Sequence, residues 1–284
     1  MEVKSAAMRK TLILSILILM ALPLAAQQLR LPRASPNSTL TQTVGLTDIT
    51  IKYSRPGVKG RQIWGALVPY DTIWRTGANE ATVITFSDDV LINGQKLAKG
   101  SYALFTVPRK DAPWDVVFNS QAEQWGAFTH DKAKDVLTVT AKPEKADFRE
   151  WMEFEIPEMT TDTAKIAVRW ENIAVPFTVD TQSTEHAMAA AKKSVAAIDT
   201  QRWQLPLSAA DFAFQNGRMA EAHAWLDQAL AASQNTRTLW LKARMEAKEG
   251  NKAEAKKTLD AAVAKASDAD KTFVEEIKKQ AAAW

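Results

Sequence analysis

The hydrophobic period of this chain changes once, near Asp180, and this change determines the class of fold. Between about Thr39 and Asp180, apolar and polar residues alternate with a period of two in short runs, as they do in half-buried β-strands. After Asp180 the sequence is rich in alanine and follows a helical period. We therefore predict a mainly β region followed by a smaller all-α region, and not the alternating strands and helices that build a parallel sheet.

The β region contains roughly ten short strand-like runs separated by turn residues. In the run 49–53 apolar and polar residues alternate, and the Asn93-Gly94 pair between two apolar runs is typical of a tight hairpin. The remaining runs are 82–87, 90–92, 95–97, 101–107, 114–118, 136–141, 151–156, 164–170 and 175–179. This pattern predicts an antiparallel β-sandwich or jelly roll that occupies residues 27–180.

The helical region, residues 181–284, contains an internal repeat. A first helix is expected over 185–198, and Pro206 suits the opening turn of the next helix. Five pairs recur with a shift of 33 residues: Ala210 and Ala243, Gly217 and Gly250, Ala222 and Ala255, Leu226 and Leu259, Ala229 and Ala262. The repeat resembles tetratricopeptide helix pairs, whose period is about 34. Two roles stay open: helices 185–282 bind a protein partner, or they only cap the sandwich.

Residues 1–26 have the pattern of a secretory signal peptide. Basic residues precede an apolar run from Leu12 to Leu22, and Ala25-Ala26 supply the small residues of a cleavage site. The run is shorter than the roughly 20 residues that span a bilayer. We expect an exported protein, periplasmic or secreted, whose mature chain has no transmembrane segment. A retained N-terminal anchor is the alternative.

Composition argues against several classes of function. The absence of cysteine excludes disulfides, thiolate metal sites and thiol catalysis. A formal net charge of +3, from 36 Lys+Arg and 33 Asp+Glu, gives no polyanion-binding signature. Spacings typical of metal ligands, serine nucleophile elbows and phosphate loops do not occur. We expect no metal, no cofactor and no nucleic-acid partner, and we interpret His130-Asp131 as a loop histidine and a capping aspartate.

The segment 54–86 and the loop around Trp125 carry the candidate binding residues. Long ordered loops between strands are where binding groups are generally placed. An aromatic face beside a guanidinium, and an amide beside a carboxylate, can stack on a sugar or another ring and hydrogen-bond its polar edge. The candidate ligand-binding residues are Arg55, Arg61, Trp64, Trp74, Arg75, Asn79, Glu80 and Trp125.

Three functions are compatible with these residues. The leading hypothesis is a non-enzymatic binding module for a glycan or another polar envelope component. The second is a hydrolase or isomerase that uses Glu80 as acid or base and Arg75 as an anion anchor, which predicts a raised pKa for Glu80. The third is a purely structural scaffold in the periplasm, which predicts no pocket. A structural interpretation of the segment 54–86 also stays open, in which Trp64 and Trp74 fill the open end of the sandwich and Arg75 pairs with Glu80 as a buried clip.

The β region also contains four phrases that together resemble a known family: LPRASPNSTLTQTVGLTDITIKYSRPGVKGR, IWGALVPYDTIWRTGANEATVITFS, QWGAF and AVPF. They are similar to the exported bacterial family known as domain of unknown function 2911, over about Gln28 to Val179. Some members of that family carry C-terminal helical repeats. The resemblance implies no established activity, substrate or cofactor. It marks as family-pattern positions Arg55, Pro56, Gly57, Arg61, Trp64, Trp74, Arg75, Gly77, Asn79, Glu80, Trp125 and Gly126.

Overall fold

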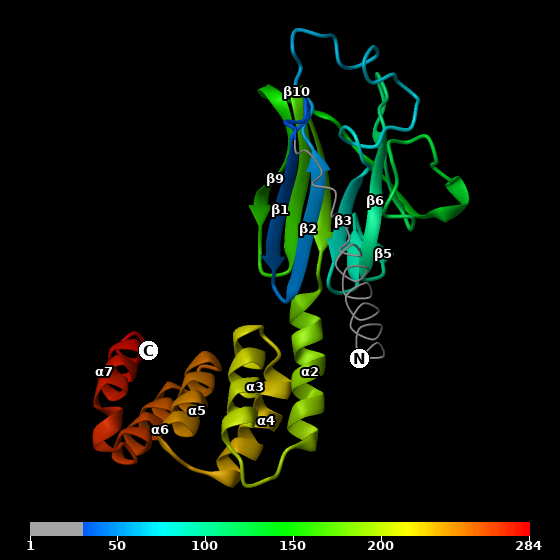
Figure 1. The fold of residues 1–284 in the computed structure, drawn as a ribbon. Coiled ribbons are helices and arrows are strands. Elements are labelled where there is room, and N and C mark those ends of the chain that lie inside the picture. Colours follow the sequence, from blue (N-terminus) through cyan, green and yellow to red (C-terminus); the bar gives the residue numbers. More distant parts are fainter. Residues whose placement is uncertain (1–30) are drawn as a thin grey trace, which may run out of the picture.

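The computed structural model describes residues 31–284, so the predicted signal peptide, residues 1–26, lies outside the described residues. Ten strands fall between residues 37 and 180, and six α-helices follow them (Figure 1). The predicted fold class is confirmed, because two antiparallel sheets form a sandwich-like β region that precedes an all-α region. Within the described range, no helix is long and apolar enough to cross a membrane.

The β region consists of two antiparallel sheets. The larger sheet has the strand order β1-β2-β3-β6-β7-β8, and the smaller has the order β5-β4-β10-β9. The strands are β1 (Asn37–Val44), β2 (Thr47–Ser54), β3 (Thr82–Phe86), β4 (Val90–Ile92), β5 (Gln95–Leu97), β6 (Gly100–Val107), β7 (Trp114–Asn119), β8 (Asp135–Ala141), β9 (Glu144–Met159) and β10 (Thr163–Asp180). The β4–β5 hairpin turns at Asn93-Gly94, as the sequence predicts.

Two features of the strand pattern differ from the prediction. Strand β1 lies outside the predicted runs, yet it pairs along its whole length with β2. The predicted runs 164–170 and 175–179 form one strand, β10, and the run 151–156 is the middle of β9. Irregularities in the β9–β10 ladder, with Glu171 at a φ of 54°, let this long hairpin continue where the alternation breaks.

Four tryptophans join the long β2–β3 loop to the core between the sheets. Trp64 contacts Trp74, Trp114 and Trp170, with ring centroids 4.8 to 5.8 Å apart. Trp74 stacks on Trp170 at 5.9 Å. All four side chains are buried. Trp114 and Trp170 lie on strands, whereas Trp64 and Trp74 come from the loop, so this loop is part of the core.

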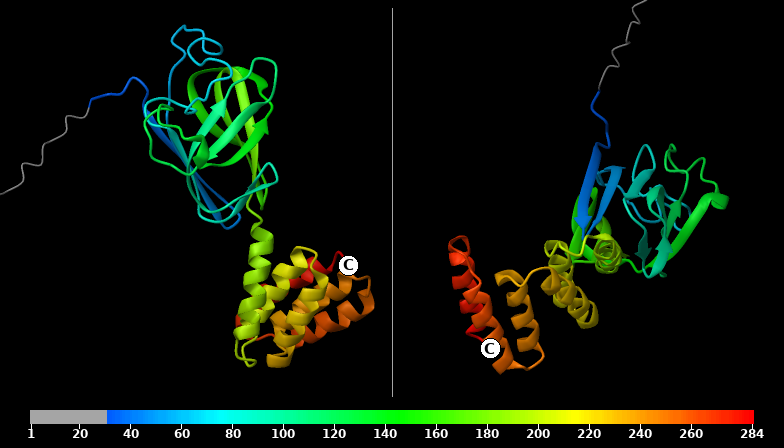
Figure 2. Two further views of the ribbon diagram at one scale, coloured as in Figure 1. Left: turned by 90° about the vertical axis from the view of Figure 1, so that its right-hand side faces the viewer. Right: turned by 90° about the horizontal axis from the view of Figure 1, so that it is seen from below.

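The helical region is a row of packed helix pairs that extends away from the sandwich (Figure 2). The helices are α2 (Ser183–Ala197), α3 (Gln204–Gln215), α4 (Met219–Ala232), α5 (Thr236–Lys248), α6 (Lys252–Ala264) and α7 (Lys271–Ala281). Gly217 and Gly250 have φ values of 72° and 89° at the α3–α4 and α5–α6 turns, as the repeat predicts. Pro206 lies in the first turn of α3, also as predicted. Arg244 donates a 2.7 Å hydrogen bond to Asp211, 33 residues earlier.

Helix α2 begins directly after β10 and is tied to two turns of the sandwich (Figure 1). The Ser183 hydroxyl accepts a hydrogen bond from the Leu46 amide at 2.9 Å. The Asp162 carboxylate accepts hydrogen bonds from the Thr184 amide and hydroxyl at 2.8 and 2.7 Å. Gly45, at a φ of 58°, packs so closely that a Cβ there would lie 2.2 Å from the Ser183 hydroxyl oxygen. The joint between β10 and α2 is therefore hydrogen-bonded to both the β1–β2 turn and the β9–β10 turn, and it is closely packed at Gly45.

Substitution Gly45→Ala tests this joint, and Gly60→Ala is its matched control. Both glycines have a left-handed φ, but a Cβ at Gly60 meets no atom within 4 Å. We expect Gly60→Ala to lower the free energy of unfolding by about 1 kcal/mol through backbone strain alone. Gly45→Ala should cost a further ~1–3 kcal/mol because Ser183 must move. Urea denaturation measures both values, and equal losses would contradict the packed joint.

Candidate functional site

A groove of about 420 Å³ lies on the outer face of the larger sheet. Its floor follows the register of three neighbouring strands, because Thr39 of β1 pairs with Lys52 of β2, which pairs with Val83 of β3. The segment that follows β7 forms a wall. We name this site the sheet groove, and its lining residues are Asn37, Ser38, Thr39, Lys52, Tyr53, Ser54, Glu80, Ala81, Val83, Ala122, Glu123 and Gln124.

Backbone pairing places the exposed side chain of Trp125 beside the sheet groove, and the exposed Phe128 follows on the same loop. The Ala81 amide donates a 3.0 Å hydrogen bond to the carbonyl of Gln124. Glu80 and Trp125 face each other in an antiparallel bridge, which directs their side chains to the same side. Trp125 is 59% exposed and Phe128 is 85% exposed. An exposed indole offers both an apolar face and a polar N–H to a ligand.

Arg33 holds the carboxylate of Glu80. The Arg33 Nη1 donates hydrogen bonds to both carboxylate oxygens, at 2.9 and 2.8 Å, and to the Asn37 side chain at 3.2 Å. The Arg33 hydrogen bond lowers the pKa of Glu80 below its usual range. The expected Arg75–Glu80 clip is therefore wrong. The acid–base alternative expects a raised pKa at Glu80, and the shift has the opposite direction.

Arg75 is half-buried and lies outside the residues that line the sheet groove. Its Nε is buried and, within residues 31–284, has no hydrogen-bond partner. Burial lowers the pKa of this guanidinium. The sequence analysis expects Arg75 to pair with Glu80, five residues later, but in the structure Arg33 forms the ion pair with Glu80.

A chain of hydrogen bonds connects Asn79 with the Arg33–Glu80 pair. Asn79 has a left-handed backbone, with a φ of 59°. Its amide group donates to the Ser54 hydroxyl at 3.3 Å, and Ser54 donates to the Asn37 side chain at 3.0 Å. Asn37 also accepts from Arg33. Because each polar group holds the next, one end of the sheet groove has a fixed arrangement of donors and acceptors.

Four of the predicted binding residues have structural roles. Trp64 and Trp74 are each only 8% exposed, so neither ring is available to stack on a ligand. Arg55 donates to the Met152 carbonyl at 2.8 Å and to the carboxylate of Glu153 at 2.9 Å. The guanidinium of Arg61 donates to two backbone carbonyls of its own loop, at 2.6 and 3.1 Å.

The predicted set therefore divides, and only part of it reaches the sheet groove. Glu80 lines the groove, while Asn79 and Trp125 lie next to it. The groove residues on strands, such as Thr39 and Lys52, are absent from the predicted set. Their signal is the run of hydroxyl and amide side chains at the exposed positions of β1, which alternate with half-buried positions.

His130 and Asp131 have the roles that the sequence predicts. His130 lies 2.9 Å from the carboxylate of Asp135 and packs edge-on against Phe105. Asp131 caps a short 3₁₀ helix by accepting a hydrogen bond from the Ala133 amide at 3.0 Å. In the part of the chain that the structure describes, no cluster of three His, Asp or Glu residues could hold a metal ion.

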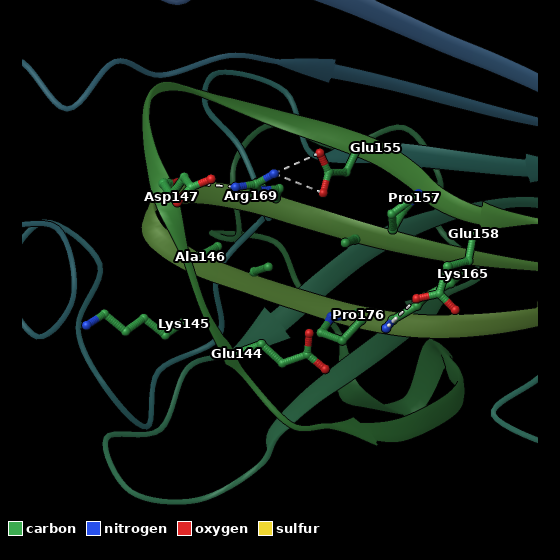
Figure 3. A pocket seen from close by; sticks show the side chains of 12 residues that line it. Glu144, Lys145, Ala146, Asp147, Glu155, Pro157, Glu158, Lys165, Arg169 and Pro176 are labelled. Carbon is green, nitrogen blue, oxygen red and sulfur yellow. Dashed lines mark hydrogen bonds and ion pairs between the residues drawn. The ribbon is translucent and has the colours of Figure 1, made fainter.

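A second hollow of about 560 Å³ lies on the β9–β10 hairpin (Figure 3). Two of its three cations are paired: Arg169 donates to the carboxylate of Glu155 at 3.2 and 3.3 Å, and Lys165 donates to Glu158 at 3.2 Å. The third cation, Lys145, also lines the hollow. The sheet groove is the stronger candidate because it combines uncharged polar groups with neighbouring exposed aromatic rings.

Alanine substitutions should separate the core tryptophans from the exposed one. We expect Trp64→Ala to lower the free energy of unfolding by about 3–5 kcal/mol, while Trp125→Ala should change it by about 0.5 kcal/mol or less. Urea denaturation measures both effects. If Trp64→Ala prevents folding, Trp64→Phe should still destabilise the protein measurably. A larger loss at Trp125 than at Trp64 would contradict the described packing.

The Arg33–Glu80 contact should show a defined dependence on pH. Since the pKa of Glu80 is lowered in the folded protein, the contact stabilises the fold above the ordinary glutamate pKa. This stabilisation is lost as pH falls through the folded-state pKa. Arg33→Gln should return the pKa of Glu80 toward its ordinary value in a carboxyl-carbon NMR titration, and Arg75→Gln should leave it unchanged. A larger effect of Arg75→Gln would support the original clip instead.

A family model described as "Protein of unknown function (DUF2911)" matches residues 35–179. A search of curated proteins and a search of solved structures found no match. The family match covers nearly the whole β region, including the strands and loops that build the sheet groove, and it stops before α2.

Proposed function

This chain belongs to the DUF2911 family of unknown function, and we propose that its β region is a binding module for a polar ligand of the glycan type. The observation that carries this proposal is the combination of a polar groove with an exposed tryptophan beside it. Neither feature alone specifies a ligand class. Together they provide hydrogen bonds for hydroxyl groups and an apolar surface for the face of a sugar ring.

The polar groups of the sheet groove suit a hydroxyl-rich ligand. Hydroxyl and amide side chains can both donate and accept hydrogen bonds, as the hydroxyl groups of a sugar do. Besides the buried Tyr53, the groove lining contains five such side chains, namely Asn37, Ser38, Thr39, Ser54 and Gln124. Ala81, Val83 and Ala122 supply apolar surface between them. The hydrogen-bond chain through Ser54 holds part of this set in place before a ligand arrives, which lowers the entropic cost of binding.

Trp125 supplies the stacking surface in this proposal. Its bridge partner Glu80 lines the groove, and Phe128 lies three residues further along the same exposed loop. The Arg33–Glu80 pair supplies a fixed, ionised carboxylate that accepts hydrogen bonds from a ligand. Because Glu80 stays ionised when its pKa is lowered, we assign it a binding role and not the role of a general acid.

The compartment and the second half of the chain complete the proposal. The signal-peptide pattern of residues 1–26, with cleavage near Ala26, supports an exported protein that is periplasmic or secreted. Helices 185–282 form an array of packed pairs, an architecture that offers extended surfaces to proteins. We assign ligand binding to the β region and contact with a protein partner to the helices.

Calorimetric titration with a panel of oligosaccharides and peptidoglycan fragments tests the glycan site. We expect at least one member to bind, and Trp125→Ala to weaken that binding about tenfold, a loss of about 1.4 kcal/mol. Val83→Phe should abolish binding because the larger side chain fills the groove floor. Phe148→Ala is the control, since Phe148 is 52% exposed but lies on β9 of the other sheet.

The outcome of this titration is decisive in two ways. If no member of the panel binds, the glycan assignment is wrong. If a glycan binds and both Trp125→Ala and Val83→Phe leave its affinity unchanged, the sheet groove is not the site.

A further inference from the structure

The helical array contains a cationic groove that the proposed glycan site does not involve. A cavity of about 410 Å³ lies between side chains of α3, α5, α6, α7 and the last two residues, Ala283 and Trp284. We name it the helix groove, and its lining residues are Phe214, Trp240, Arg244, Ala247, Lys248, Lys252, Gln280, Ala283 and Trp284. The set contains three cations and three aromatic rings, and it includes no acidic residue.

The two lysines of the helix groove are the charges that remain available to a ligand. Arg244 already donates to Asp211 at 2.7 Å and lies 5.0 Å from the ring centre of Phe214. Lys248 and Lys252 form no ion pair with any residue in the range 31–284. They lie at the end of α5 and the start of α6, on either side of the Gly250 turn. The turn therefore keeps two positive charges close together at one rim.

An aromatic surface lies beside these charges. The rings of Trp240 and Trp284 stack with centroids 5.4 Å apart and planes 13° apart. Trp240 is the buried ring of this stack, while Trp284 remains partly exposed. A groove with cations at its rim and stacked rings in its wall favours a ligand that carries carboxylates and apolar side chains together.

We propose that the helix groove binds an acidic, leucine- or aromatic-containing segment of a partner protein. Charge complementarity selects this occupant, because the unpaired lysines attract carboxylates and lower the affinity for basic segments. The aromatic wall accounts for the apolar side chains, which a simple inorganic anion lacks. The proposal deepens the protein-contact role assigned to helices 185–282, and it does not depend on the sheet groove.

Fluorescence anisotropy with the full chain tests this inference. The probe is a short labelled peptide that alternates glutamate with leucine, and the comparison peptide alternates lysine with leucine. We expect only the acidic peptide to bind, with an affinity that falls as salt is added. The double substitution Lys248→Glu and Lys252→Glu should weaken binding about tenfold or more.

A matched control keeps the change in net charge constant. Lys256→Glu with Lys265→Glu alters two exposed lysines of the same helix pair that do not line the helix groove, so the acidic peptide should bind this variant as it binds the wild type. Trp284→Ala should weaken binding while the dependence on salt persists. The proposal is overturned if the acidic and basic peptides bind with equal affinity. It is also overturned if the control variant loses as much affinity for the acidic peptide as the Lys248→Glu and Lys252→Glu variant, or if a single-stranded oligonucleotide binds more tightly than the acidic peptide.

The same variants separate this inference from the glycan site. Val83→Phe blocks the sheet groove and should leave peptide binding intact, and the lysine substitutions should leave glycan binding intact. Failure of the peptide to bind refutes the role of the helix groove without affecting the glycan result.

Discussion

Burial of loop tryptophans in the sandwich is the interaction on which the rest of the β region depends. The chain has no cysteine, so no disulfide holds the sheets together, and burial of apolar surface must supply the stability. Trp64 and Trp74 fix the long β2–β3 loop in the core, and the Trp74 ring also donates to the Gly77 carbonyl at 3.1 Å. This anchoring places Asn79 and Glu80, a few residues later, at the edge of the sheet groove.

The class of fold could be predicted because its determinants are local. Alternation with a period of two, the Asn93-Gly94 turn and the 33-residue repeat each lie within a short stretch of sequence. Strand β1 could not be predicted in the same way, since its exposed face carries asparagine and threonine and its register with β2 defines it. The sequence predicts two runs where β10 is one strand, because the bulges near Glu171 interrupt the alternation.

The candidate site was less predictable, for a physical reason. The local sequence does not distinguish a loop tryptophan whose ring is buried in the core, as at Trp64, from one whose ring is exposed to water, as at Trp125. The sheet groove combines three strands whose register brings Thr39, Lys52 and Val83 side by side. Arg33 lies 47 residues from its partner Glu80. Such neighbours depend on long-range pairing, which local patterns do not encode.

The joint between β10 and α2 has a consequence for how the two halves act together. Because Ser183 and Asp162 hold the start of α2 against the sandwich, no flexible linker separates the two grooves. With a flexible linker, the β region and the helices would move independently, and the effective concentration of one binding site near the other would depend on the length of the linker. A packed joint holds α2 in one direction relative to the sandwich instead. With a ligand at each of the two proposed sites, the spacing and orientation between the ligands would be set by the fold and not by the length of a linker.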